Sequence, residues 1–295
     1  LAASTGIIGA ALVLLTILAQ PHMLKNKYNP NLACGVVCAT GTLGILIPPS
    51  LPMIIAATLS GLSVGKLFLA GAIPGLLLGM GLMLVAYFVA KKKNYHKHQK
   101  STPLQVLKSF IDTFWALLMT LIILFGIIGG VFTPTEASVG AVLYALFIGT
   151  FVYKKLNLKN ISVVILDSMK TTASLMILVG FANLFGFILI TEQIPQRISE
   201  QILLLTTNKY AVLLLINLLL ILVGTFMETI AALLILFPIL LKVAIEVNVE
   251  PIHFTVIAVL NLIIGLTTPP VGVCLFVASS IGKTCLLYTS DAADE

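Results

Sequence analysis

Two proline pairs, each set in an apolar stretch beside hydroxyl side chains, are the residues of this chain best suited to chemistry. One lies in GILIPPSLPM at 44–53 and the other in GLTTPPVGVC at 265–274. Proline has no amide hydrogen, so each pair unwinds its helix and leaves main-chain carbonyls without donors. Such carbonyls are costly in hydrocarbon unless something polar binds them. A bound cation is one answer, and half-helix N-termini that face an anion are another.

Hydroxyl groups beside these breaks add to the oxygen ligands available there. Ser50, Thr267 and Thr268 flank the two pairs, and sodium prefers hard oxygen donors such as carbonyls and hydroxyls. The alternative is two ordinary proline kinks, in which each hydroxyl bonds back to a carbonyl of its own helix. The matched pair of breaks favours the site.

Glu228 is an ionisable residue within an apolar stretch, in GTFMETIAAL. A charged group at membrane depth is a functional candidate, and the neighbouring Thr229 is a plausible oxygen ligand. A carboxylate at the start of a helix also stabilises the helix dipole. The sequence leaves these two interpretations open for Glu228.

Composition sets the class of protein. Of 295 residues, 59% are hydrophobic and 9% are charged, and the mean hydropathy is +1.12. A water-soluble fold could not bury so much apolar surface, which excludes a soluble enzyme, a nucleic-acid-binding domain and a disordered chain. The net charge of +6 needs no nucleic-acid partner, because the basic residues gather in short loops between apolar runs. We therefore expect an all-α polytopic protein of the lipid bilayer.

Eight apolar segments follow one another along the chain. They are predicted at 2–20 (ending at Gln20–Pro21), 33–58, 66–90, 109–132, 137–153, 162–190, 210–241 and 253–282. The segment 210–241 is too long for one simple span and too short for two with a proper loop, which favours a re-entrant hairpin. The lysine-rich loops 91–108 and 154–160 are expected in the cytoplasm, and the mixed loops 191–209 and 242–252 outside.

The breaks at 44–53 and 265–274 occupy matching places in two halves of opposite predicted orientation. Broken spans at matching positions of inverted repeats are the best sequence indication of a secondary-transporter binding site. We predict that 1–108 is the C-terminal part of a first repeat and 109–283 is a second repeat. The segment 284–295 resembles a translated sequencing adapter and is predicted to be non-native.

Five motifs together resemble one known family. They are ATGTLGILIPPSLPM at 39–53, LFLAGAIPGLLLGM at 67–80, GVFTPTEAS at 130–138, METIAALLILFPILL at 227–241 and NLIIGLTTPPVGVCLFVASSIGK at 261–283. In this order they resemble the large membrane subunit of tripartite ATP-independent periplasmic (TRAP) transporters, over nearly all of 1–283. By this resemblance the chain is a fragment that lacks sequence before Leu1 and after Lys283.

The resemblance implies a fold, an activity and partners. The implied fold is an inverted-repeat, elevator-type transporter with re-entrant helical hairpins and broken helices. The implied activity is sodium-driven uptake of organic acids across the bacterial inner membrane, with a small membrane subunit and a periplasmic solute-binding protein as partners. Sodium is the coupling ion, held by carbonyls and hydroxyls near Ser50 and Thr268, and no other cofactor is expected.

The candidate site is predicted from the residue types and from this resemblance together. Residues 3–6 are implied to be the tip of a first hairpin, and Thr40 and Thr42 gain support only through the repeat and the resemblance. The predicted cation- and substrate-binding residues are Ser4, Thr5, Gly6, Thr40, Gly41, Thr42, Pro48, Pro49, Ser50, Glu228, Thr229, Thr267, Thr268, Pro269 and Pro270.

Other polar residues favour structural roles. Glu136 is expected to cap a helix that begins near Ala137, with Thr133 or Thr135 as the N-cap. Asn183, Asn217 and Asn261 lie within spans, where interhelical hydrogen bonding is favoured. The cysteines within apolar segments are expected to be small buried residues.

Two other functions were weighed against the transporter subunit. An intramembrane enzyme would need a nucleophile with its base or a metal cluster, and the sequence has no HExxH, no paired intramembrane aspartates and no GxSxG with a plausible partner histidine at membrane depth. The second alternative is a stand-alone sodium/dicarboxylate symporter of related elevator design. No P-loop glycine pattern is present either, so we expect no nucleotide to drive transport.

Overall fold

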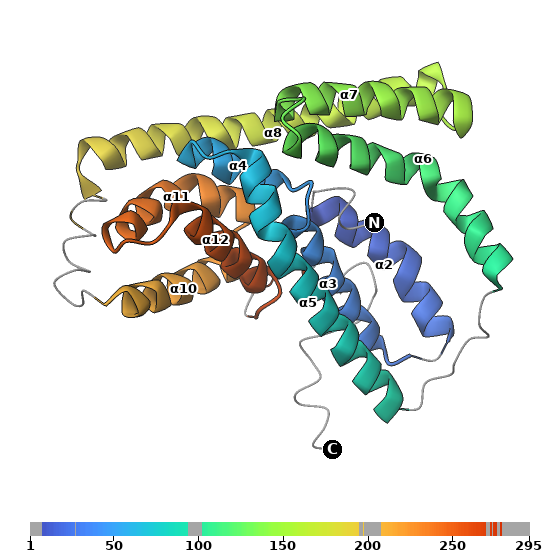
Figure 1. Ribbon diagram of the computed structural model, residues 1–295, viewed down its shortest axis with the longest axis horizontal. Coiled ribbons are helices and arrows are strands. Elements are labelled where there is room, and N and C mark those ends of the chain that lie inside the picture. The colour runs from blue at the N-terminus through green and yellow to red at the C-terminus, as the bar shows by residue number, and fades with distance from the viewer. Residues whose placement is uncertain are drawn as a thin grey trace. The chain divides into compact units, whose positions relative to one another are not determined.

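The computed structural model describes residues 8–26, 28–93, 102–194 and 208–269, together with residues 197, 272, 274, 275 and 278. The described residues form helices, turns and loops (Figure 1). They fold as two compact units. We call residues 1–98 with 193–295 the split unit, because two distant parts of the chain build it, and residues 99–192 the middle unit.

Seven described helices form the split unit. They are α2 (Ile8–Lys25), α3 (Pro30–Leu46), α4 (Leu51–Ser60), α5 (Val64–Lys92), α10 (Lys209–Phe226), α11 (Thr229–Glu246) and α12 (Pro251–Leu266). Helix α12 contacts α3, α4, α5, α10 and α11, which places it at the centre of the unit. Buried apolar side chains of α3, α11 and α12 supply most of the core.

Helix α2 extends further than the sequence predicted. The prediction that this apolar segment ends at Gln20–Pro21 is wrong, because the helix continues through Pro21 to Lys25. A proline inside a helix removes one hydrogen bond and kinks the helix, but the turn that follows still forms. Asn26 donates its amide to the carbonyls of His22 and Met23 at 3.3 and 3.1 Å.

The predicted break at the first proline pair is confirmed. Helix α3 ends at Leu46 and α4 begins at Leu51, and the Pro48–Pro49 peptide between them is cis. Pro52, which also figured in the expected break, lies instead within the first turn of α4, where a proline is tolerated because that amide has no helical acceptor.

The segment 210–241 is two helices, as predicted. Helices α10 and α11 are separated by the two-residue turn Met227–Glu228, and each is 18 residues long. Each helix is therefore about 27 Å long and long enough by itself to cross a membrane. The re-entrant course of this hairpin stays a prediction.

Three long helices form the middle unit. They are α6 (Pro103–Ile128), α7 (Pro134–Phe147), which continues into the π-helical segment η1 (Ile148–Val152), and α8 (Leu158–Thr191). Because α5 runs to Lys92 and α6 starts at Pro103, the connection between them is shorter than the predicted loop 91–108. The Tyr144 hydroxyl donates to the carbonyl of Trp115 at 2.9 Å and joins α7 to α6.

Helix α7 begins with the predicted cap. Thr133 is the N-cap: its hydroxyl accepts from the Glu136 amide, and its own amide donates to the Glu136 carboxylate at 2.8 Å. This reciprocal capping box satisfies two helix-end amides at once. It confirms the structural interpretation of Glu136.

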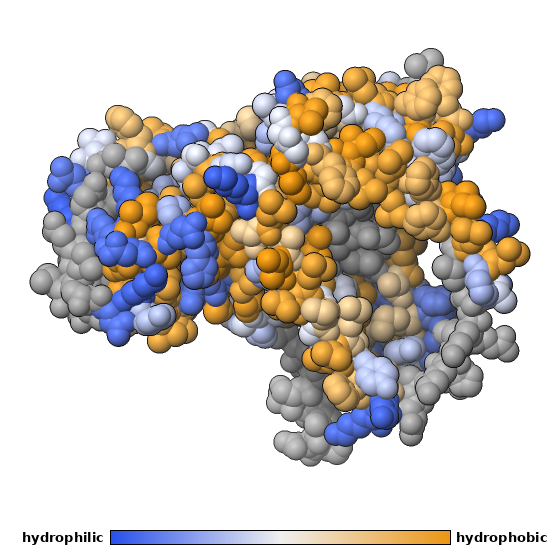
Figure 2. Space-filling view, viewed as in Figure 1, coloured by the Kyte–Doolittle hydropathy of each residue, from blue (hydrophilic) through white to orange (hydrophobic). Residues whose placement is uncertain are grey.

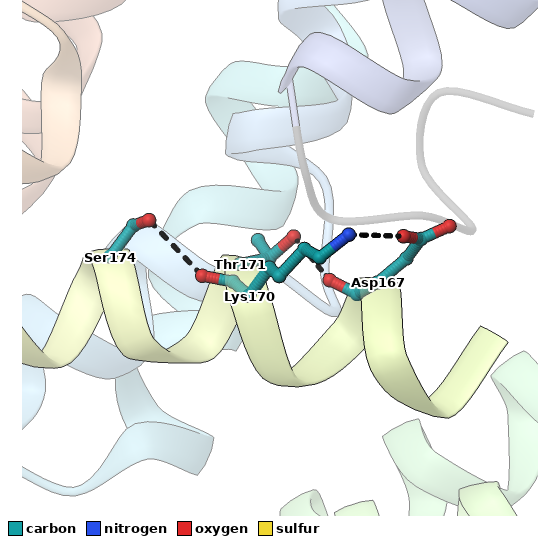
Figure 3. Close-up of polar contacts among 4 residues, drawn as sticks. All are labelled: Asp167, Lys170, Thr171 and Ser174. Atoms are coloured by element: carbon teal, nitrogen blue, oxygen red, sulfur yellow. Dashed lines mark hydrogen bonds and ion pairs between the residues drawn. The ribbon is translucent and has the colours of Figure 1, made fainter. Parts of the chain in front are cut away.

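Most large side chains of the middle unit are apolar and exposed, and apolar side chains gather over α6 and α7 (Figure 2). Helix α8 carries one polar face, on which Asp167 and Lys170 form an ion pair of 3.6 Å (Figure 3). On the same face Thr171 and Ser174 bond back to the carbonyls of Asp167 and Lys170. Counted over the described residues of both units, six helices are long and apolar enough to cross a membrane.

The two compact units do not coincide with the two predicted repeats, because the split unit takes residues from both. The assignment of 1–108 and 109–283 as inverted repeats stays a prediction. The whole predicted tail at 284–295, and most of 270–283, lie outside the described residues.

Candidate cation and substrate site

The first break is held together by Ser50. This residue is fully buried, and it is the N-cap of α4, because its hydroxyl oxygen accepts from the Met53 amide at 3.3 Å. The same hydroxyl donates to the carbonyl of Ile45 in the last turn of α3. Residue 49 is proline and cannot supply the amide that Ile45 would meet in a continuous helix. Ser50 therefore replaces the missing donor and starts the next helix.

The second break uses threonines in the same way. Thr267 and Thr268 both donate their hydroxyls to the carbonyl of Ile264, at 3.0 and 2.6 Å. The Thr268 amide donates to the carbonyl of Gly265 at 2.9 Å, which Pro269 cannot serve. At both breaks the hydroxyls bond back to their own helix, which was the alternative to a site. Donating a hydrogen does not use an oxygen lone pair, so the threonine oxygens can still accept, and the Ser50 oxygen keeps one lone pair beside the one that accepts from the Met53 amide.

The hairpin turn carries an acid and a buried hydroxyl. Glu228 is the N-cap of α11, and its Oε2 accepts from the amides of Ile230 and Ala231 at 2.9 and 3.2 Å. The capping interpretation is confirmed for this residue. The next residue, Thr229, is fully buried, and its Oγ1 has no hydrogen-bond partner among the residues that the structure describes. A buried polar atom without a partner is costly and calls for an explanation such as a bound ion or water.

Contacts across the split unit bring the breaks and the turn to one region. The Gly272 amide, beyond the second proline pair, donates to the carbonyl of Thr225 beside the hairpin turn at 3.2 Å. The Cys38 thiol of α3 donates to the carbonyl of Cys274 at 3.4 Å. Helix α4, which starts at the first break, packs against both α11 and α12. The two broken helices and the hairpin therefore meet within one compact unit.

The other predicted residues divide into two groups. Thr40 and Thr42 lie on α3 before the first break, where their hydroxyls donate to the carbonyls of Val36 and Ala39 at 2.7 and 2.9 Å, and Gly41 is buried between them. Ser4, Thr5, Gly6 and Pro270 lie outside the described residues. No role in binding is tested for any predicted residue.

Two features of this region were not predicted. Cys38 and Cys274 are buried and free, as expected, but their contact across 236 residues had no signal in the sequence. In the sequence Thr225 is one more hydroxyl in an apolar helix, and nothing distinguishes it. Its carbonyl, which meets Gly272, is a main-chain atom that residue types do not reveal.

The predicted interhelical role is confirmed for two of the three asparagines. Asn261 of α12 donates its Nδ2 to Asn217 Oδ1 of α10 at 2.7 Å and to the carbonyl of Ile257 at 2.9 Å. Asn261 is buried, so the bond lies between the helices and not at their edge.

Apolar helices of membrane-crossing length, two helix breaks and a hairpin packed into one unit are typical of a multi-pass membrane transporter. The chain matches, over residues 1–291, the family described as "Tripartite ATP-independent periplasmic transporter, DctM component". It belongs to this family and is a large permease component of a TRAP transporter. The match runs into the predicted tail, whose non-native origin stays a prediction.

Curated relatives carry the corresponding names. The chain is 44% identical over 260 residues to the sialic acid TRAP transporter large permease protein SiaM of Vibrio cholerae, a match that covers 88% of this chain and 61% of that protein. It is 43% identical over 292 residues to the C4-dicarboxylate TRAP transporter large permease protein DctM of Pseudomonas aeruginosa, covering 99% and 68%. It is 41% identical over 275 residues to the isethionate TRAP transporter permease protein DctMQ of Oleidesulfovibrio alaskensis, covering 93% and 43%.

These comparisons decide between the classes weighed from the sequence. The relatives are named as transporter permeases, so the chain is a transport component and the intramembrane-enzyme alternative is rejected. The chain spans about three fifths of the length of the sialic acid relative.

Proposed function

We propose that this chain forms the sodium and substrate path of a TRAP transporter that imports an organic acid across the bacterial inner membrane. A periplasmic binding protein delivers the acid, and a small membrane subunit completes the complex. The family supports the class of complex. The relatives' names, which refer to sialic acid, C4-dicarboxylates and isethionate, support an organic acid as the substrate.

The observation that carries the proposal is the Thr229 hydroxyl, which is fully buried and has no partner among the described residues. It lies at the start of α11, in the unit where the two broken helices meet the hairpin. Hydroxyl and carbonyl oxygens suit a hard monovalent cation, and such a cation would satisfy this oxygen. Lone pairs of Ser50 and Thr268 and the carbonyls around the proline pairs are the further ligands that we propose.

Glu228 makes this region more suitable for a cation than for an anion. Its carboxylate already accepts from the Ile230 and Ala231 amides, which are the amides that a helix N-terminus would otherwise offer to an acidic substrate. The carboxylate also adds negative charge near the proposed ligands. We therefore propose that sodium binds at the hairpin turn. The organic acid would bind on the open side of the two helix breaks.

Coupling follows if the acid binds well only when sodium is bound. The cation then neutralises the charge of Glu228, which would repel an anionic substrate. An elevator movement of inverted repeats would carry both across the membrane. The elevator and the repeats remain proposals that rest on the matched breaks.

The test uses the permease polypeptide that contains these residues, assembled with its small membrane subunit in liposomes, with binding protein supplied outside. Labelled sialic acid, a C4-dicarboxylate and isethionate are offered in turn. We expect uptake of at least one acid with an inward sodium gradient and none with potassium in its place. Uptake that persists without any sodium overturns sodium coupling, and uptake without binding protein favours the stand-alone symporter.

A matched pair of variants tests the site itself. Thr229→Val keeps the shape and removes the unpartnered hydroxyl, and we expect it to raise the sodium concentration for half-maximal uptake about tenfold. Thr255→Val is the control, because Thr255 is equally buried but donates its hydroxyl to the Pro251 carbonyl of its own helix. Equal sodium dependence in the two variants would contradict the assignment of Thr229.

A further inference from the structure

Helix α10 packs along α12 more extensively than along α11, to which the hairpin turn connects it. A hairpin that opens as a free flap would keep its two arms together and leave its neighbours. Here α10, the first arm, packs mainly against α12. The second arm, α11, packs mainly against α4 and α12. The arms of the hairpin therefore have different attachments.

A glycine pair brings α10 and α12 into main-chain contact. A Cβ added to Gly265 would lie 2.6 Å from the Cα and carbonyl carbon of Gly224 and 2.7 Å from the Ile221 carbonyl oxygen. A Cβ added to Gly224 would lie 2.9 Å from the Leu262 carbonyl oxygen. These neighbours are main-chain atoms, so they cannot turn aside as a side chain could. Only glycine fits at both positions.

An amide pair fixes the same two helices about three helical turns before the hairpin turn. The bond from the buried Asn261 Nδ2 to the half-buried Asn217 Oδ1 measures 2.7 Å, and the hydrocarbon of a membrane offers no water to replace it. It sets the register of α10 on α12 as well as their separation, because a slip by one residue would part the two side chains.

Both contacts lie directly before the parts proposed to bind sodium. Gly224 precedes Thr225, the last buried residue before the turn at Glu228, and Gly265 precedes the break at Thr267. The bond from Gly272 to the Thr225 carbonyl then ties the turn to the chain beyond the break. The distance from the turn to the break is thus set by contacts outside the site.

We propose that Asn217, Asn261, Gly224 and Gly265 are positioning residues, which hold the hairpin turn against the broken end of α12 and so set the sodium affinity. This inference rests on the proposed function.

Sodium-dependent thermal stability of the purified permease polypeptide tests this without a substrate. The melting temperature is measured as NaCl replaces KCl at constant ionic strength, because a ligand that binds only the folded state raises it. We expect a sodium-specific rise in the wild type, whose half-saturation gives the affinity. For Gly265→Ala we expect a lower melting temperature in potassium and a half-saturating sodium concentration at least tenfold higher.

Variants of the two asparagines give a second test, which can still be made if Gly265→Ala does not fold. Asn217→Leu and Asn261→Leu should each raise the half-saturating concentration about threefold, because interhelical hydrogen bonds in membranes are individually modest. The double variant should match either single one, since both break the same bond. Gly81→Ala is the control, because a Cβ there meets nothing within 4 Å, and it should leave the half-saturation unchanged.

The outcomes separate the two proposals. A wild type with no sodium-specific rise overturns the proposed function and this inference together. In a second outcome the wild type shows the rise, while the glycine and asparagine variants melt at lower temperatures but keep the wild-type half-saturating sodium concentration. That result overturns only the positioning role, and the contacts are then structural. An additive shift in the double asparagine variant also overturns it.

Discussion

The split unit and the middle unit are built from similar apolar helices but use them in opposite ways. In the split unit two helices end at proline pairs, the buried Ser50 and the half-buried Thr267 and Thr268 bond to main-chain carbonyls there, and α12 packs against five neighbours. In the middle unit α6 and α8 run for 26 and 34 residues, and most of their large side chains are exposed. Apolarity therefore does not distinguish the two units, whereas polar backbone enclosed at helix breaks does.

The largest contrast is expected from glycine substitutions. Gly224→Ala should destabilise the protein by about 1–3 kcal/mol, because the new Cβ meets main-chain atoms of α12. Gly180→Ala in α8 meets nothing within 4 Å and should stabilise by up to about 1 kcal/mol through helix propensity. Thermal unfolding in detergent measures both. Shifts of the same sign would erase the contrast between the units.

A smaller contrast is expected from two serines. Ser50→Ala removes the cap of α4 and the donor for the Ile45 carbonyl and should cost about 1–2 kcal/mol. Ser174→Ala removes a hydroxyl that only bonds back to its own exposed helix, so the change should stay within about 0.5 kcal/mol. The same unfolding measurement applies, and an equal cost for both serines would show that the break gains nothing from Ser50.

The two glutamate caps are expected to differ in the kind of effect that their substitution has, and not in its size. Glu136→Gln weakens the capping box of α7 and should lower stability by about 0.5–1 kcal/mol with no effect on the sodium response. Glu228→Gln weakens the cap of α11 by a similar amount and should also change the sodium-dependent rise in melting temperature. Identical sodium responses in both variants would remove Glu228 from the site.

The smallest effect is expected at the exposed ion pair. Asp167 and Lys170 are 69% and 79% exposed and lie one helical turn apart, so Asp167→Asn should change stability by less than about 0.5 kcal/mol. Uptake should stay at the wild-type rate. If uptake is lost while stability stays normal, the middle unit takes part in transport, which the exposure of its side chains does not suggest.

Proline pairs and apolar lengths predicted much of the split unit. Proline removes a donor at a known position, so the break between α3 and α4 and the end of α12 near Thr267 could be read directly. The length of 210–241 predicted a turn, which falls at Met227–Glu228. Pro21 shows the limit, because one missing hydrogen bond bends a helix without ending it and the neighbours decide the outcome.

The chemistry of the site was less predictable than its place. Ser50 and Thr229 are both buried hydroxyls beside a helix start, yet one has partners on two sides and the other has none among the described residues. That difference depends on which carbonyl lies within reach after folding. The contacts of Cys38 with Cys274 and of Gly224 with Gly265 likewise join residues whose separation in sequence carries no pattern.

The split of one unit across the chain has a consequence for synthesis. About 170 residues separate the end of α4 from the start of α11, the helix that packs against it. At about 5–20 residues per second of synthesis, the first break waits roughly 10–30 s before its final neighbours exist. During that interval the first break lacks α11 as a neighbour, so we expect any of its carbonyls that Ser50 does not serve to need water or another polar partner until α11 is made.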